Sequence, residues 1–227
     1  MYRFFVSHKL DNKKFELDKD ILNHIKVLRL KKDEKIYCIY EKEVYLCRVE
    51  NNYAIIEEKT NINNEWEHDV YLFAAIINIK RFEWLIQKSV ELGVTHFIPI
   101  ITKNVNKKYL DQFENKIIRF NEIAKNASEQ SFRNILINIA KPVAFEDAIK
   151  IKTKHKYIAH EKVDFSTNND QSILFESDIS FFVGPEGGFD ETEIKKAIDN
   201  NIIPISLGKR ILRSETASLY LLSRIMK

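Results

Sequence analysis

The sequence has 227 residues, of which 44% are hydrophobic and 30% charged, and its net charge is +3. A chain of this length and polarity can bury a sizeable core in one or two domains. No apolar run approaches the roughly 18 residues that span a bilayer, and the first residues lack the apolar core of a signal peptide, so we expect a cytoplasmic protein without a membrane partner. The two cysteines, Cys38 and Cys47, have neither disulfide-framework nor metal-ligand spacing, so we expect buried reduced thiols and no metal.

Residues 1–66 are predicted to form a small β domain. β-branched and aromatic residues predict strands at 2–6, 35–40, 44–50 and 53–59. One helix is predicted over 21–30, with Asp18 or Asp20 as its N-cap. The polar, Asn-rich stretch that follows the last strand has no periodicity, so we place the domain boundary there and assign 67–227 to a second domain.

In the second domain, predicted strands alternate with predicted helices. The strands are 70–77, 95–101, 135–140, 156–160, 179–184 and 202–208, and the helices are 80–93, 110–131, 145–150, 190–200 and 214–227. Asp190 and Glu193 have the spacing of a capping box, and Ser214 or Thr216 could cap the final helix. Repeated β-α-β units imply a mostly parallel sheet with helices on both faces, in which ligands bind beyond the carboxyl ends of the strands.

The glycines of this sequence gather at two such strand ends. Only five glycines are present, and Gly184, Gly187 and Gly188 lie within one five-residue stretch. A glycine retained in a glycine-poor chain indicates a position where another residue does not fit. The spacing is neither G-x-G-x-x-G nor a P-loop, but Pro185 and the glycine pair would let the backbone approach a flat ligand closely. A tight strand-to-helix turn without a ligand is the alternative.

The second loop, "LGKRILRSETA" (207–217), follows the next predicted strand. Two arginines flank the apolar pair Ile211 and Leu212, an arrangement that suits a pocket for an aromatic base and its phosphates. An ion pair between Arg213 and Glu215 at the start of the helix is the alternative.

These two motifs, together with four further blocks in the same order, resemble the bacterial 16S ribosomal RNA uridine N3-methyltransferases, the RsmE family of the SPOUT superfamily. The further blocks are "RFFV" (3–6), "HIKVLRL" (24–30), "QKSVELGVTHFIPI" (87–100) and "EIAKNASEQSFRNILI" (122–137). The resemblance covers nearly the whole chain. Two departures, Asp33 in place of an expected glycine and a hairpin at 41–43 without glycine, concern turns of the first domain.

The resemblance implies an α/β fold class in which a small PUA-like β-barrel domain for RNA precedes a SPOUT trefoil-knot methyltransferase domain. It also implies S-adenosyl-L-methionine as cofactor, a homodimer, and 16S rRNA of the small ribosomal subunit as partner. Carried over by position, the cofactor cleft consists of His160, Gly184, Pro185, Glu186, Gly187, Gly188, Leu207, Gly208, Ile211, Leu212 and Ala217, with 159–161 as a third wall.

The implied reaction is methylation of N3 of a specific uridine. Because N3 carries a proton and lies on the Watson–Crick edge, the base must be deprotonated and turned out of any helix. We expect Arg213 to stabilise the developing negative charge and Glu215 to accept the proton or to hold Arg213 in place. Contacts to the RNA backbone are expected from Arg3, Lys26, Arg29, Lys103, Lys107 and Arg133. The alternatives are a SPOUT enzyme acting on transfer RNA or a ribose 2′-hydroxyl, and a non-catalytic RNA-binding relative.

Overall fold

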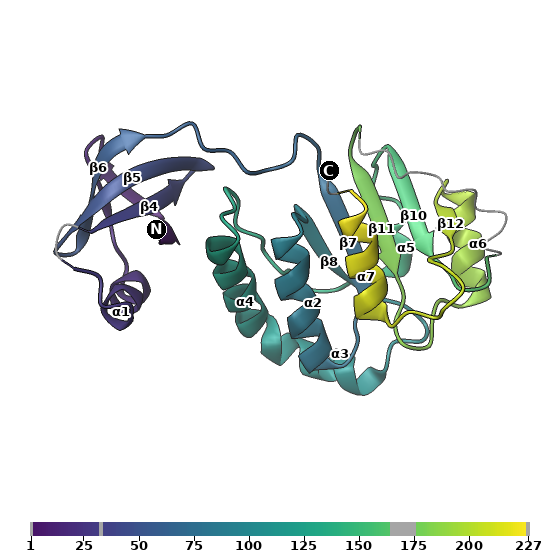
Figure 1. Cartoon of the computed structure of the whole chain (residues 1–227). Helices are drawn as coiled ribbons and strands as arrows, with labels where there is room; N and C mark the ends of the chain where they lie inside the picture. Colours follow the sequence, from purple (N-terminus) through teal and green to yellow (C-terminus); the bar gives the residue numbers. More distant parts are fainter. Residues whose placement is uncertain (1, 32–33, 164–175, 226–227) are drawn as a thin grey trace. The chain divides into compact units, whose positions relative to one another are not determined.

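The structure, a computed structural model, describes residues 2–31, 34–163 and 176–225, so Asp33 lies outside the described residues. The chain divides into two compact units (Figure 1). Unit 1 consists of Met1–Glu65 and Ser128–Leu136, and unit 2 of Trp66–Ala127 and Ile137–Lys227.

Unit 1 contains one curled, six-stranded sheet in the order β1-β4-β5-β6-β3-β2. Its elements are β1 (Arg3–Phe5), β2 (His8–Asp11), β3 (Lys14–Glu16), α1 (Lys19–Val27), β4 (Lys35–Tyr40), β5 (Glu43–Glu50) and β6 (Tyr53–Lys59). The pairing is antiparallel except between β1 and β4. The β2–β3 hairpin was not predicted, because its largely charged and exposed residues lack a strand pattern.

The core of unit 1 lies between this sheet and α1. Phe4, Phe15 and Ile36 are fully or almost fully buried there. Cys38 and Cys47 are buried free thiols in the same cluster, as predicted. Burial of aromatic and branched side chains therefore stabilises unit 1 by the hydrophobic effect, without a disulfide.

Helix α1 has a defined cap at each end. Asp18, one of the two predicted N-caps, accepts a hydrogen bond from the backbone of the first turn. At the other end Arg29 has a φ of +53°. The N–H of Leu30 donates to the carbonyl of Ile25 (3.3 Å) and that of Arg29 to the carbonyl of Lys26 (3.1 Å), the two bonds of a Schellman motif. Arginine thus occupies a position where glycine is preferred.

Residues 128–136, predicted to lie in the second domain, belong to unit 1. Arg133 makes a bidentate ion pair with Glu65, with Nη2–Oε2 at 2.7 Å and side chains only 4% and 12% exposed. Arg3 donates from Nη1 to the carbonyl oxygen of Phe132 (2.7 Å), and its guanidinium lies over the Phe132 ring. Asn134 donates to two backbone carbonyls of the first segment. These contacts explain why unit 1 needs both segments.

Unit 2 contains a six-stranded sheet in which all pairs are parallel, in the order β12-β10-β11-β7-β8-β9. Its strands are β7 (Val70–Ala75), β8 (His96–Ile101), β9 (Val143–Ala144), β10 (His155–Ala159), β11 (Ile179–Val183) and β12 (Ile203–Ile205). Its helices are α2 (Ile79–Glu91), α3 (Lys107–Phe113), the short 3₁₀ helix η1 (Glu114–Lys116), α4 (Ile117–Gln130), α5 (Phe145–Ala148), α6 (Glu191–Asp199) and α7 (Ser214–Ser223).

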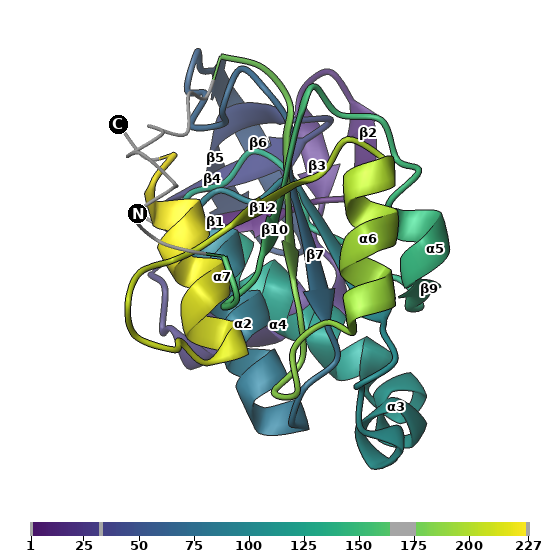
Figure 2. The same cartoon turned by 90° about the vertical axis from the view of Figure 1, so that its right-hand side faces the viewer.

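Helices cover both faces of this sheet, with α2 and α7 on one side and α5 and α6 on the other (Figure 2). The predicted α/β class with a small β domain is confirmed, and the trefoil knot stays a prediction. No helix among the described residues is long and apolar enough to cross a membrane.

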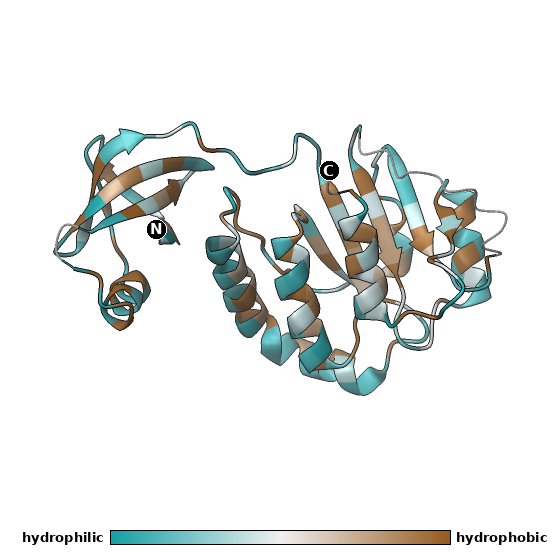
Figure 3. Cartoon of the chain, in the orientation of Figure 1, coloured by the Kyte–Doolittle hydropathy of each residue, from teal (hydrophilic) through white to brown (hydrophobic). Residues whose placement is uncertain are grey.

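The core of unit 2 follows from near-continuous apolar strands. All five residues of β11 are buried, and Phe182 of this strand stacks on Phe73 of β7 at 4.3 Å between ring centroids. Hydrophobic colouring runs along the central strands, whereas hydrophobic and hydrophilic residues alternate along α2 and α4 (Figure 3). This pattern is typical of a parallel sheet covered by helices on both faces.

The prediction of a strand at 135–140 was wrong, and no strand is assigned there. The side chain of Asn121 takes both hydrogen bonds of the Ile139 backbone: its Oδ1 accepts from the N–H (2.9 Å) and its Nδ2 donates to the carbonyl (3.0 Å). A backbone group satisfied by a side chain is not available to a strand ladder. The edge of the sheet is instead the two-residue strand β9.

Three predicted helices agree with the structure to different extents. The capping box of Asp190 and Glu193 is present at the start of α6, as predicted. The predicted side-chain cap of the final helix was wrong, because Arg213 is its N-cap residue and no side chain makes a capping hydrogen bond. The single helix predicted over 110–131 is divided among α3, η1 and α4.

Candidate active site

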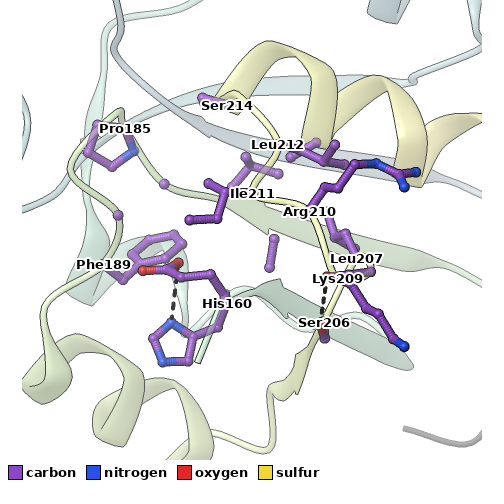
Figure 4. A pocket seen from close by; sticks show the side chains of 17 residues that line it. His160, Pro185, Phe189, Ser206, Leu207, Lys209, Arg210, Ile211, Leu212 and Ser214 are labelled. Carbon is purple, nitrogen blue, oxygen red and sulfur yellow. Dashed lines mark hydrogen bonds and ion pairs between the residues drawn. The ribbon is translucent and has the colours of Figure 1, made fainter. Parts of the chain in front are cut away.

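A pocket with a cavity volume of about 120 Å³ opens at the carboxyl ends of β10, β11 and β12. Three loops line it: 159–161 after β10, 183–189 after β11 and 206–217 after β12. Figure 4 shows Pro185 and Phe189 of the second loop facing Leu207 and Ile211 of the third. The parallel sheet thus brings segments that are far apart in the sequence to one edge.

The loop after β11 has a conformation that requires glycine. Gly188 has a φ of +66°, and its N–H donates to the carbonyl of Pro185 (2.9 Å), which closes a tight turn. A Cβ added to Gly184 would lie 3.1 Å from the Phe189 ring of the same loop. A side chain at position 184 would press on the Phe189 ring, and one at position 188 would be strained by the positive φ.

Residues Lys103 and Asn104 hold this loop from outside. Asn104 donates from Nδ2 to the carbonyls of Gly187 and Gly188, each at 3.1 Å. The ammonium of Lys103 lies 2.8 Å from Asp190, and this hydrogen bond is the main cause that lowers the pKa of Asp190 far below its ordinary value. Lys103, predicted to contact RNA, is therefore engaged in an ion pair with the start of α6.

The loop after β12 supplies the apolar wall. Gly208 has a φ of +121° with no atom within 4 Å of an added Cβ, so its backbone conformation and not its packing requires glycine. Leu207, Ile211 and Leu212 line the pocket, and Ile211 is 87% exposed. A large apolar side chain exposed beside a pocket suits a flat hydrophobic ligand.

Two buried polar atoms at the pocket have no hydrogen-bond partner among the described residues. These are Nδ1 of His160 and Oγ of Ser214. The Glu161 carboxylate lies 3.9 Å from the His160 nitrogen, at ion-pair but not hydrogen-bond distance. Buried polar groups are normally satisfied, so these atoms indicate a polar ligand or water.

Nine of the eleven residues predicted for the cofactor cleft line the pocket. They are His160, Gly184, Pro185, Gly188, Leu207, Gly208, Ile211, Leu212 and Ala217. Glu186 and Gly187 do not line it, and Glu186 instead accepts a hydrogen bond from the backbone N–H of Asn78 (3.4 Å). Ala159 and Glu161 of the predicted third wall also line it, as does Arg210, one of the two arginines expected beside the apolar pair. Five lining residues were missed, and adjacency to predicted residues was the only signal for them: Val183, Phe189, Ser206, Lys209 and Ser214.

The predicted catalytic residues lie at the start of α7, outside the pocket lining. Arg213 is exposed and makes no side-chain ion pair or hydrogen bond with the described residues, so the alternative of an ion pair with Glu215 is not observed. Glu215 is only 7% exposed. Its Oε1 lies 3.8 Å from Nε of Arg81, and its buried Oε2 has no hydrogen-bond partner within the described part of the chain.

The structure divides the predicted RNA contacts into exposed and buried cations. Lys26 and Arg29 are exposed on unit 1, and Lys107 is exposed on unit 2. Arg3 and Arg133 are only 5% and 3% exposed. Burial lowers the pKa of Arg3. This location contradicts their predicted role, because a buried cation that bonds within unit 1 cannot follow an RNA backbone.

Comparison with known proteins places the chain in a family. The family described as "RNA methyltransferase domain" matches residues 64–226, and the one described as "RNA methyltransferase PUA domain" matches 17–58. Ribosomal RNA small subunit methyltransferase E from Mesomycoplasma hyopneumoniae is 40% identical over the full length of both chains. The chain belongs to this methyltransferase family.

Other members of the family support the same assignment. The Bacillus subtilis protein of the same name is 30% identical, with 93% of this chain and 89% of the relative covered. The crystal structure of the Neisseria gonorrhoeae protein of that name, bound to S-adenosyl methionine, has a TM-score of 0.85 at 29% identity and covers 98% of this chain and 95% of its own. Within the described residues there is no group of three or more potential metal-ligating side chains.

Proposed function

We propose that this chain transfers a methyl group from S-adenosyl-L-methionine to N3 of a uridine in 16S ribosomal RNA of the small subunit, uridine 1498 in the family. The observation that carries the proposal is the pocket between two glycine loops at the carboxyl edge of a parallel sheet. Membership of the family and the cofactor-bound neighbour support it. We further propose a homodimer that works in the cytoplasm.

The pocket residues fit this cofactor. Leu207, Ile211 and Leu212 offer apolar surface to the adenine ring. The two loops that contain Gly188 and Gly208 bring backbone groups close to the same pocket. The unpartnered Nδ1 of His160 can bond to a polar atom of the ligand, and the Glu161 carboxylate suits a cationic group. When bound, the cofactor would supply an electrophilic methyl group on a positively charged sulfur.

Arg213 and Glu215 would prepare the uracil. The guanidinium of Arg213, exposed and unengaged by the described residues, can stabilise negative charge on the base oxygens. Arginine stays protonated, so it is not the base. The Glu215 carboxylate would accept the N3 proton, directly or through a water, once the base is turned out of its helix. Its Oε2 is buried and has no hydrogen-bond partner among the described residues.

The test is methyl transfer from labelled S-adenosyl-L-methionine to purified small ribosomal subunits, followed by nucleoside analysis. We expect 3-methyluridine. Label on a ribose 2′-hydroxyl or in transfer RNA would assign the chain to another substrate class. Binding of the cofactor, measured by calorimetry, without any transfer to small subunits or transfer RNA would indicate a non-catalytic relative.

Arg213→Ala should separate chemistry from cofactor binding. We expect the rate to fall by about 10²- to 10³-fold, as for loss of a preorganised electrostatic group, with the cofactor affinity nearly unchanged. The control is Arg119→Ala, which removes an exposed arginine that does not line the pocket and should leave both the rate and the cofactor affinity unchanged. A loss of cofactor affinity in the Arg213 variant would place this residue in the cofactor wall instead.

A further inference from the structure

We propose that Arg81, in the first turn of α2, is a positioning residue for this reaction. It connects the carboxylate of Glu186, in the loop after β11, with the carboxylate of Glu215, in the first turn of α7. The inference rests on the proposed function for its chemistry and on the geometry of unit 2 for its contacts.

Arg81 lies between two carboxylates from separate loops. Its Nη1 is 3.9 Å from Oε1 of Glu186, and its Nε is 3.8 Å from Oε1 of Glu215. The backbone N–H of Asn78, at the N-cap of α2, also donates to Oε1 of Glu186 (3.4 Å). The N-terminal end of α2 thus presents a guanidinium and a backbone donor to the loop, in addition to the positive end of its dipole.

The two carboxylates that face Arg81 differ in their exposure to solvent. The side chain of Glu186 is 40% exposed and can be solvated by water, whereas that of Glu215 is 10% exposed. A buried carboxylate without a compensating charge is costly, and it relieves this cost by moving toward water or by taking up a proton. Within the described residues, Arg81 is the only cation that forms an ion pair with Glu215.

This arrangement gives Arg81 an effect on chemistry that differs from its effect on cofactor binding. Neither Arg81, Glu186 nor Glu215 lines the pocket, so the cofactor keeps its contacts when Arg81 is removed. The carboxylate that would accept the N3 proton, however, loses the cation that faces it and holds it in place. We therefore expect removal of Arg81 to lower the rate of methyl transfer much more than the affinity for the cofactor.

The experiment compares the full-length wild type with Arg81→Met and Arg81→Lys. The matched control is Arg119→Met, which removes an arginine whose ion pair with Glu122 is more than half exposed. Cofactor affinity is measured by calorimetry, and transfer is measured at saturating cofactor and small subunits. We expect Arg81→Met to lower the saturated rate by about tenfold or more with less than about a threefold change in affinity, and Arg81→Lys to recover part of the rate.

Three results would overturn the inference. The first is a wild-type rate in Arg81→Met, and the second is an equal loss of rate and affinity. The third is a Lys variant no better than the Met variant in a protein that melts like the wild type. If Arg81→Met does not fold, the double variant Glu186→Gln/Arg81→Lys is compared with Arg81→Lys. We expect the double variant to transfer methyl groups no more slowly than Arg81→Lys alone, and a further loss of rate would contradict the inference. Absence of transfer by the wild type would refute the proposed function instead.

Discussion

Arg29 holds a left-handed backbone conformation that an arginine side chain disfavours. Its φ of +53° completes the Schellman motif at the end of α1, where glycine would fit without strain. The side chain is exposed, so no buried contact compensates for this conformation. A strained and exposed cation on the unit that matches the PUA domain is consistent with its predicted contact to the RNA backbone.

Arg29→Gly should therefore stabilise unit 1 while weakening RNA binding. Relief of the left-handed strain favours glycine by roughly 1–2 kcal/mol, and the added freedom of the unfolded chain offsets part of this, so we expect a net gain of up to about 1 kcal/mol in urea unfolding. Arg29→Ala keeps the strain and removes the same charge. In both variants, the slope of the logarithm of rRNA affinity against the logarithm of salt concentration should fall in magnitude by about 1. Wild-type affinity in Arg29→Ala would exclude the contact.

At the scale of elements, the start of α6 anchors the loop that lines the pocket. The Asp190 carboxylate accepts from Thr192 and from Lys103, while Glu193 closes the capping box. The hydrogen bond from Lys103 is the largest cause of the lowered pKa of Asp190. The ion pair therefore connects the loop after β8 to the helix that follows the glycine loop.

This pKa shift predicts the direction of a pH effect. A carboxylate with a pKa lowered by folding contributes stability above its unfolded value of about 3.9, and this contribution is lost as the pH falls through the folded value. Asp190→Asn can still cap the helix but does not titrate. We expect the wild type to melt at a higher temperature than this variant at pH 7, with the difference shrinking from about pH 5 downward. A difference that stays constant down to pH 2 would contradict the assignment.

On the scale of the whole molecule, unit 1 is built from two segments that are distant in sequence. The buried ion pair of Arg133 with Glu65 joins them, with side chains 4% and 12% exposed. The carboxylate also accepts from the backbone N–H groups of Asn134 and Ile135. Removing the charge of Glu65 leaves the buried guanidinium of Arg133 without its counter-charge and weakens the hydrogen bonds of the two backbone donors.

Glu65→Gln in the full-length chain should thus destabilise unit 1 by about 3–5 kcal/mol, the range for breaking a buried ion pair. Glu122→Gln, which breaks an exposed pair with Arg119, should cost less than about 1 kcal/mol. Hydrogen exchange at the amides of β4 and β5 would report the loss within unit 1. Equal protection in both variants would show that the pair contributes no net stability.

The sequence alone was sufficient for features that depend on neighbouring residues. Apolar runs alternating with amphipathic stretches predicted the parallel sheet, and the spacing of Asp190 and Glu193 predicted the capping box. The scarcity of glycine indicated functional positions at Gly184 and Gly208, which follow β11 and β12 and line one pocket. These features are local because backbone conformation, helix caps and strand periodicity are set within a few residues.

Tertiary structure decided the features that depend on contacts across the chain. The side chain of Asn121 satisfies the backbone of Ile139 and removes a predicted strand. Arg133 is buried in an ion pair with Glu65, and Arg81 forms an ion pair with the predicted catalytic residue Glu215. Sequence spacing carries little information about such pairs, because the burial and charge of each partner depend on which distant segment folds against it.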